Sequence, residues 1–82
     1  MSTTNLNQIL AARVRAVMAS QKLTVAAVSE SLGYSRDAMS KRLSGKVDFS
    51  LTDIDRFAKV AGYSPSDLVS EQFAMLPLSK AA

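Results

Sequence analysis

Apolar residues in the N-terminal part of the chain recur every three or four positions, which is the spacing of one face of an α-helix. These residues are Leu6, Leu10, Val14, Val17 and Met18. The pattern predicts a helix from about Asn5 to Ser20 with one buried face. Arg13 and Arg15 lie off that face, so we expect them to be solvated surface charges.

Glycines follow the next apolar segments, at the positions where a helix needs a left-handed residue to end. The second helix is predicted to begin after a cap at Thr24 and to end at Gly33. The third is predicted to run from a cap at Ser35 to Ser44, just before Gly45. Only a very short turn then separates these two helices, and so short a connection fixes the angle at which they cross.

A capping signal predicts the start of the fourth helix. Ser50, with Asp53 three residues later, resembles a capping box, and Gly62 is expected to end the helix that follows. The apolar face predicted for this helix contains Leu51, Ile54, Phe57, Ala58 and Ala61.

The fifth helix is predicted to begin at Ser64 and Pro65, which is the preferred pairing of a cap with the first helical residue. We expect Pro77 to close it. Its inward-facing residues are expected to be Leu68, Val69 and Phe73.

The fold class predicted by these patterns is all-α, a compact five-helix bundle, since no stretch shows the alternation of a strand. A chain of 82 residues has room for one hydrophobic core. We therefore expect a single domain over residues 1–82, with a core of about 6–70 and a tail of 71–82.

The composition excludes most catalytic and metal sites. The chain has no Cys and no His, so it cannot form a disulfide, a zinc site with thiolate or imidazole ligands, or a catalytic dyad that uses either residue. We expect no enzyme activity, no cofactor and no metal. The first residues lack the basic and apolar runs of a signal peptide, and no stretch approaches the roughly 20 apolar residues of a membrane span. We therefore expect a soluble, cytoplasmic protein with no membrane partner.

Positive charge is concentrated around the third predicted helix. Within residues 34–46, four basic residues stand against one acidic residue, and this excess equals the whole net charge of +3. At about 100° per residue, one side of the helix holds Ala38, Met39 and Leu43, and the other holds Asp37, Ser40, Lys41 and Ser44. With Arg36 in the first turn, such a face is typical of a helix that reads base edges in the major groove of DNA. An ordinary solvated face would show the same pattern.

The two-helix unit and its surroundings form a recognisable motif. It begins with Thr24-Val-Ala-Ala-Val28-Ser29-Glu-Ser-Leu32-Gly33 and continues with Ser35, Met39, Leu43, Gly45, the Leu51 to Ala61 segment and Gly62-Tyr63-Ser64. From Ala11 to Val69 the sequence therefore resembles the lambda-repressor-like, XRE-type helix-turn-helix domains of phage repressors, Cro proteins and their bacterial relatives.

The resemblance implies a regulator of transcription that binds double-stranded DNA with the helix over residues 35–44. It implies base contacts from Arg36, Asp37, Ser40 and Lys41. It implies phosphate contacts from Ser35, Arg42, Ser44 and Lys46. Since the chain is little longer than such a DNA-binding domain, we expect a phage or prophage repressor or a Cro-like protein.

Two positions depart from the family pattern. Many relatives carry Gln directly after the capping Thr, where it contacts a phosphate, but this chain has Val25. Ser29 stands where Ala is usual, and we expect its hydroxyl to bond back to its own helix.

Several side chains have two interpretations. Asp37 is placed either to pair with Lys41 at i,i+4 or to accept from a cytosine amino group. Arg42, near the apolar side of its helix, either reaches a phosphate or covers the core. Tyr34 and Tyr63 are expected to be packing residues with hydrated hydroxyls.

The tail carries an apolar cluster of Phe73, Met75, Leu76 and Leu78. We expect this cluster either to pack back on the first helix or to meet a partner chain. A homodimer through the C-terminal segment would suit two DNA half-sites. The alternative function is a protein-interaction module on the same fold, an antitoxin or adaptor that uses the tail as its contact.

Overall fold

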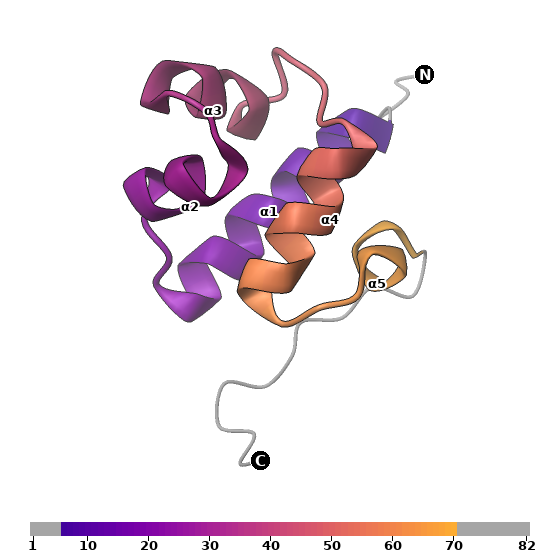
Figure 1. Cartoon of the computed structure of the whole chain (residues 1–82). Helices are drawn as coiled ribbons and strands as arrows, with labels where there is room; N and C mark the ends of the chain where they lie inside the picture. The colour runs from indigo at the N-terminus through magenta and orange to yellow at the C-terminus, as the bar shows by residue number, and fades with distance from the viewer. Residues whose placement is uncertain (1–5, 71–82) are drawn as a thin grey trace.

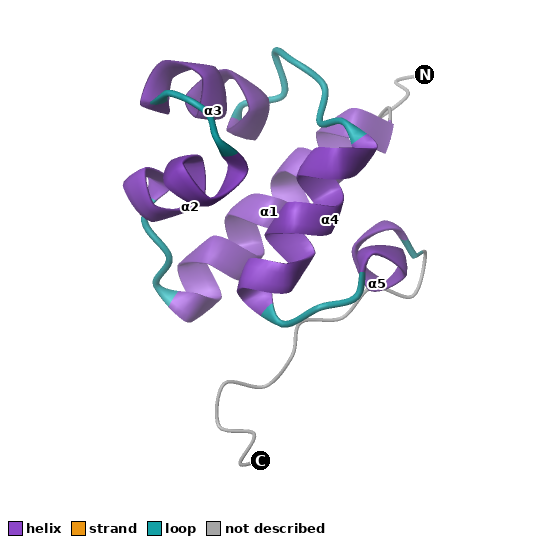
Figure 2. Cartoon of the chain, in the orientation of Figure 1, coloured by secondary structure: helices purple, strands orange, loops and turns teal. Residues whose placement is uncertain are grey.

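The structure, a computed structural model, describes residues 6–70, which form five helices and no strand (Figures 1 and 2). The helices are α1 Leu6–Gln21, α2 Val25–Leu32, α3 Arg36–Leu43, α4 Leu51–Ala61 and α5 Pro65–Val69. The predicted all-α fold with five helices is confirmed, and every predicted start lies within a residue of the observed one. Within this part of the chain no helix has the length and apolar character needed to cross a bilayer.

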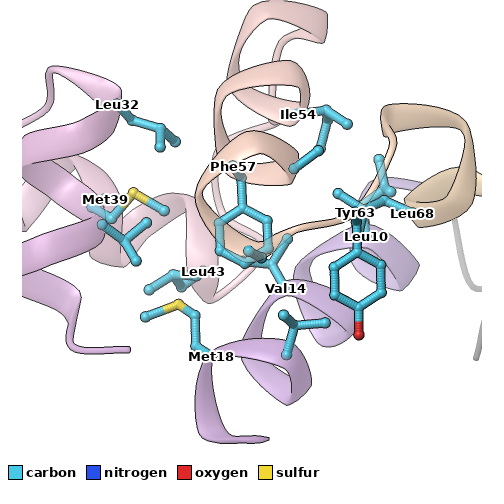
Figure 3. Close-up of a cluster of buried hydrophobic side chains, with 14 residues drawn as sticks. Leu10, Val14, Met18, Leu32, Met39, Leu43, Ile54, Phe57, Tyr63 and Leu68 are labelled. Carbon is cyan, nitrogen blue, oxygen red and sulfur yellow. The ribbon is translucent and has the colours of Figure 1, made fainter. Parts of the chain in front are cut away.

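The helices α1 and α4 lie side by side at the centre, with the α2–α3 pair on one flank and α5 on the other (Figure 1). Their facing sides enclose one core, into whose middle the ring of Phe57 is directed (Figure 3). Phe57, Met39 and Leu68 are the largest side chains that are completely buried. They come from α4, α3 and α5, and the fully buried Val14 and Val28 come from α1 and α2, so the core depends on all five helices packing together.

The predicted helix caps are confirmed. Thr24, Ser35, Ser50 and Ser64 each accept a hydrogen bond from a backbone N–H three residues later. Such side-chain caps satisfy N–H groups that have no partner inside the helix. Because this contact is local, the sequence alone was sufficient to find it.

Gly62 ends α4 in the left-handed conformation, with φ of 83°. A Cβ added there would meet nothing within 4 Å, so a side chain would cost only backbone strain. We expect Gly62→Ala to lower the free energy of unfolding by about 1–2 kcal/mol. Urea denaturation measures this loss, and Gly62→Asn is the control, because Asn tolerates the left-handed region better. Equal unfolding midpoints for the Ala variant and the original protein would contradict the expectation.

Arginine side chains bind the C-terminal carbonyls of α2 and α3 from other helices. The last carbonyls of a helix have no hydrogen-bond partner within it, and a cation near them also interacts favourably with the negative end of the helix dipole. Arg56 on α4 donates to the carbonyl of Leu32 at 3.3 Å. Arg15 on α1 donates to the carbonyl of Leu43. The C-terminal end of each helix in the two-helix unit is therefore tied to one of the central helices.

The C-terminal carbonyls of α4 and α5 are bound from α1 in the same way. Gln21 donates to the carbonyl of Ala61 at 2.8 Å, and Arg13 donates to that of Leu68 at 2.6 Å. Neither arginine is buried, and Arg15 is exposed as predicted, but these contacts give both side chains protein partners that the prediction of solvated charges did not include. Their guanidinium groups hold helix ends that only the packing of the bundle brings near them.

Three predicted core residues are exposed. The exposed fractions are 58% for Leu6, 88% for Leu51 and 42% for Val69. Each lies in the first or last turn of its helix, where the facing helices no longer cover it. The inward position in the first turn of α4 is taken instead by Asp53, which is buried.

The C-terminal predictions fall largely outside the described residues. The helix α5 ends at Val69 with Ser70 as its C-cap, well before Pro77, so Pro77 does not close it as predicted. The inward position predicted for Phe73 and the cluster predicted for the tail lie beyond residue 70.

Candidate nucleic-acid interface

The α2–α3 unit has a connection of only three residues, Gly33, Tyr34 and Ser35. Gly33 adopts φ of 81°, and the backbone N–H of Tyr34 donates to the carbonyl of Ser29 at 2.9 Å, so α2 ends abruptly. Ser35 then caps α3 by accepting from the N–H of Ala38 at 3.1 Å. The predicted short turn is confirmed, and it sets α3 at a fixed angle to α2.

The hydroxyl of Ser29 donates to the carbonyl of Val25 at 2.6 Å, one turn earlier in α2. This confirms that the unusual Ser at this position is satisfied within its own helix. Val25 itself is partly buried and packs against the core. Its side chain offers no hydrogen bond to a phosphate.

The helix α3 has one buried and one exposed face, as predicted. Met39 and Leu43 are buried, and Ala38 is half-buried. The exposed residues on and around the other face are Ser35, Arg36, Asp37, Ser40, Lys41, Ser44 and Lys46. Five of these line an open depression of about 300 Å³: Asp37, Ser40, Lys41, Ser44 and Lys46. The structure thus brings seven of the eight predicted site residues to one surface.

The charges on this surface are not equivalent. Lys41 Nζ lies 3.3 Å from Asp37 Oδ2 across one helical turn, so the predicted i,i+4 pair is formed. Both side chains are more than half exposed, and such exposed helix pairs contribute only about 0.3–0.5 kcal/mol. Arg36 and Lys46 have no ion-pair partner within residues 6–70. Arg36 and Lys46 are therefore unpaired cations on this surface, and Lys41 is paired only weakly with Asp37.

Arg42, the eighth predicted residue, points into the protein. Its guanidinium lies 3.9 Å from the ring centroid of Tyr34, and its Nη1 donates to the carbonyl of Ala38 at 2.9 Å. Its Nε is 3.6 Å from Oδ2 of Asp53, and the side chain is 18% exposed. Of the two predicted interpretations, the free protein adopts the inward one, and the predicted phosphate contact stays a prediction.

Asp53 joins α3 and the turn before it to the start of α4. Its Oδ2 accepts from the backbone N–H of Ser50 at 2.9 Å, which completes the capping box of α4. Its Oδ1 accepts from the hydroxyl of Tyr34 at 2.7 Å. With Arg42 beside it, one carboxylate contacts the turn, α3 and the start of α4.

The hydroxyl of Tyr34 donates to Asp53 within the protein, which corrects the prediction of a hydroxyl that is only hydrated. The hydrogen bond to Asp53, together with burial and the charge of that carboxylate, raises the pKa of Tyr34 above its ordinary value. The phenol therefore stays protonated and donating at neutral pH. The capping pattern in the sequence revealed only one contact of Asp53, because Tyr34 and Arg42 are distant along the chain.

Comparison with known proteins gives one match. A family model described as a helix-turn-helix domain matches residues 9–71, which include all five helices except the start of α1. No curated protein and no solved structure matches the chain.

Proposed function

The chain belongs to the helix-turn-helix domain family, and from this we propose that it is a non-enzymatic regulator that reads double-stranded DNA in the major groove with α3. The observation that carries the proposal is the division of α3 into a buried apolar side and an exposed polar side, with two unpaired cations, Arg36 in the helix and Lys46 just after it. We further propose a phage or prophage repressor or Cro-like protein, acting in the bacterial cytoplasm. That finer assignment rests on the resemblance alone.

Base contacts are proposed for the first two turns of α3. Arg36 is the first residue of the helix, where a recognition helix presents side chains to base edges. A guanidinium is suited to the two acceptors of guanine, and the neighbouring Asp37–Lys41 pair offers an acceptor and a donor. Ser40, one turn after Arg36, is short enough to let the helix approach the groove floor.

Phosphate contacts are proposed for the ends of α3. Ser35 precedes the helix, while Ser44 and Lys46 follow it, so these side chains flank the proposed base-reading residues. Such contacts fix the register of a protein on DNA without reading sequence. Arg42 would join them only by leaving Tyr34 and Asp53.

Replacing Lys46 tests the phosphate role. We expect Lys46→Ala to weaken binding to all duplexes alike and to reduce the slope of log affinity against log salt by about 1, because one fewer counterion is released. Titrations at several salt concentrations measure the slope. Lys59→Ala is the matched control, since Lys59 is exposed but lies on α4 and pairs with Asp55. A slope equal to that of the original protein would remove Lys46 from the interface.

The dimer is also part of the proposal. A single such domain covers one half-site, and a pair related by a two-fold axis would read a palindrome with half-sites about one helical turn, roughly 34–36 Å, apart. We propose a homodimer formed through the C-terminal segment. A monomer in sedimentation at high concentration, both with and without DNA, would contradict it.

Selection from random duplex pools tests the function as a whole. The purified protein is incubated with the pool at two salt concentrations, and the bound duplexes are sequenced. An enriched palindrome indicates a dimeric reader, and an enriched single half-site a monomeric one. No enrichment together with salt-insensitive binding would overturn the proposal.

A protein-interaction module, such as an antitoxin or adaptor, is the second candidate. It is favoured by Val25 at the position of a family phosphate contact, and by exposed apolar side chains away from α3. The same selection separates the two functions, because steep salt dependence is the mark of a surface that neutralises phosphates.

A further inference from the structure

The exposed large apolar side chains of residues 6–70 are mostly gathered at one groove. There are four of them, Leu6, Leu51, Val60 and Val69. All but Val60 line the same groove, whose volume is about 290 Å³. Leu10, Phe49 and Ile54 complete its apolar lining. We define this surface as the apolar groove.

The apolar groove is built from fixed elements. It lies where the starts of α1 and α4 meet the end of α5, and its lining is mainly apolar. The loop before α4 is held in place because the N–H of Phe49 donates to the side-chain oxygen of Asn7 at 3.0 Å. Such a preformed apolar surface with a polar rim is typical of an interaction site.

The size of the apolar groove indicates a short segment as its occupant. A cavity of about 150 Å³ holds one benzene, so this groove accepts about two side chains of the size of Phe or Leu. An extended apolar segment presents side chains of this size along a narrow line, so it suits such a groove.

The chain itself contains such a segment just beyond the groove. Residues 73–78 carry four large apolar side chains, and no charged residue occurs between Glu71 and Lys80. Val69, at the end of α5, lines the groove, so the segment follows only a few residues later. Asp48 also lines the groove, and Lys80 supplies a complementary charge next to the segment.

We propose that residues 73–78 of one chain dock in the apolar groove of a second copy, and that two chains exchange these segments reciprocally. Ser70 leaves α5 with extended backbone, φ −71° and ψ 148°. Glu71 and Gln72, the next residues in the sequence, are not among those that favour a turn back towards the groove of the same chain. Reciprocal exchange fills two grooves in one closed, two-fold assembly. The inference rests on the dimer of the proposed function and names its contact surface.

Charge substitutions in the full chain test the contact. Leu51→Asp places a carboxylate in the groove, and Leu76→Asp places one in the segment. Each is expected to raise the dimer dissociation constant at least tenfold, which corresponds to the loss of one buried anchor side chain. Val60→Asp is the matched control, because Val60 is exposed on α4 but does not line the groove. Since Leu51 is 88% exposed, its replacement should not unfold the protein.

Cross-linking shows which chain fills the groove, since the protein has no Cys of its own. Leu51→Cys chains are mixed with Leu76→Cys chains, treated with a short thiol cross-linker and run on a denaturing gel. The yield of covalent dimers is expected to be well above the yield from a mixture of Val60→Cys and Leu76→Cys chains. A chain that carries both Leu51→Cys and Leu76→Cys should also give covalent dimers. Equal yields in the two mixtures, or a cross-link within single chains only, would overturn the exchange.

These measurements need no DNA, so they test the exchange of segments independently of the proposed DNA binding. A cross-linked dimer that selects no DNA sequence would keep the exchange and contradict the regulator. An enriched half-site without cross-linking would keep the DNA reader and contradict the exchange.

Discussion

Replacing Asp53 with Ala is expected to lower the free energy of unfolding by about 3 kcal/mol. The substitution removes the carboxylate of a helix cap, which contributes about 1 kcal/mol. It also removes a hydrogen bond from Tyr34 to a buried charged group, for which about 1.5–3 kcal/mol is typical. Arg42, only 18% exposed and 3.6 Å away, would lose its carboxylate partner as well. Chemical denaturation of the purified variant measures the loss.

The bundle contains a matched control for this experiment. Asp67 makes the same capping box with Ser64 at the start of α5, but it is exposed, whereas Asp53 is buried. We expect Asp67→Ala to cost about 1 kcal/mol or less. Asp53→Asn, which keeps an oxygen for the cap, should lie between the two Ala variants. Equal losses for Asp53→Ala and Asp67→Ala would show that Tyr34 and Arg42 contribute nothing through Asp53.

Replacing Asp53 with Ala should also affect the proposed DNA binding. The side chain of Arg42 is on α3, and its contacts with Tyr34 and Asp53 hold that helix against the start of α4. The carbonyl of Leu43, at the other end of α3, is bound by Arg15. With both attachments intact, the recognition helix presents its exposed residues as a rigid set, so that little freedom is lost on binding.

Arg36→Ala is expected to weaken binding to the selected DNA sequence by about 1–3 kcal/mol, roughly 5- to 150-fold, the range of one specific base contact. Arg36 is exposed at the start of α3 and has no ion-pair partner within the described part of the chain. The free energy of unfolding should therefore stay unchanged. Titration of the variant with the selected duplex and with random duplex measures the specific part of the loss.

Two further variants separate the possible reasons for such a loss. Arg36→Lys keeps the charge but not the two-pronged donor geometry, so it should recover non-specific binding and little of the specificity. Lys59→Ala, with an exposed cation removed from α4, should bind as the original protein does. Equal losses on selected and random DNA would make Arg36 a phosphate contact, and no loss on either would remove it from the interface.

The positions and ends of the helices could be predicted from the sequence because the forces that set them are local. A capping hydroxyl such as that of Ser35 acts on an N–H three residues away, and a residue such as Gly62 ends a helix through its own backbone conformation. The two faces of α3 follow from the helical period in the same way. The exposure of the predicted base-contact residues was therefore already visible in the order of polar and apolar residues.

Contacts between distant residues were decided only by the tertiary structure. Arg15 and Leu43 are 28 positions apart, and Tyr34 and Asp53 are 19 apart. The local sequence pattern around each residue does not indicate which distant residue it will contact. It predicted Arg15 as a surface charge without its carbonyl partner, Tyr34 as a hydrated phenol and Arg42 as one of two alternatives. The packing of α1 and α4 against the α2–α3 unit brings these groups together.

The exposure of Leu51 and Val69 has the same physical origin. The helical period says which side of a helix is apolar, but a side chain is buried only where a neighbouring helix reaches it, and both residues lie in end turns beyond that reach. Thus the sequence by itself determined the helices, their caps and the exposed polar face of α3. The packing of the five helices decided which charged groups hold that face in place, and it left the apolar groove open, because burial and long-range hydrogen bonds depend on where helices meet in space.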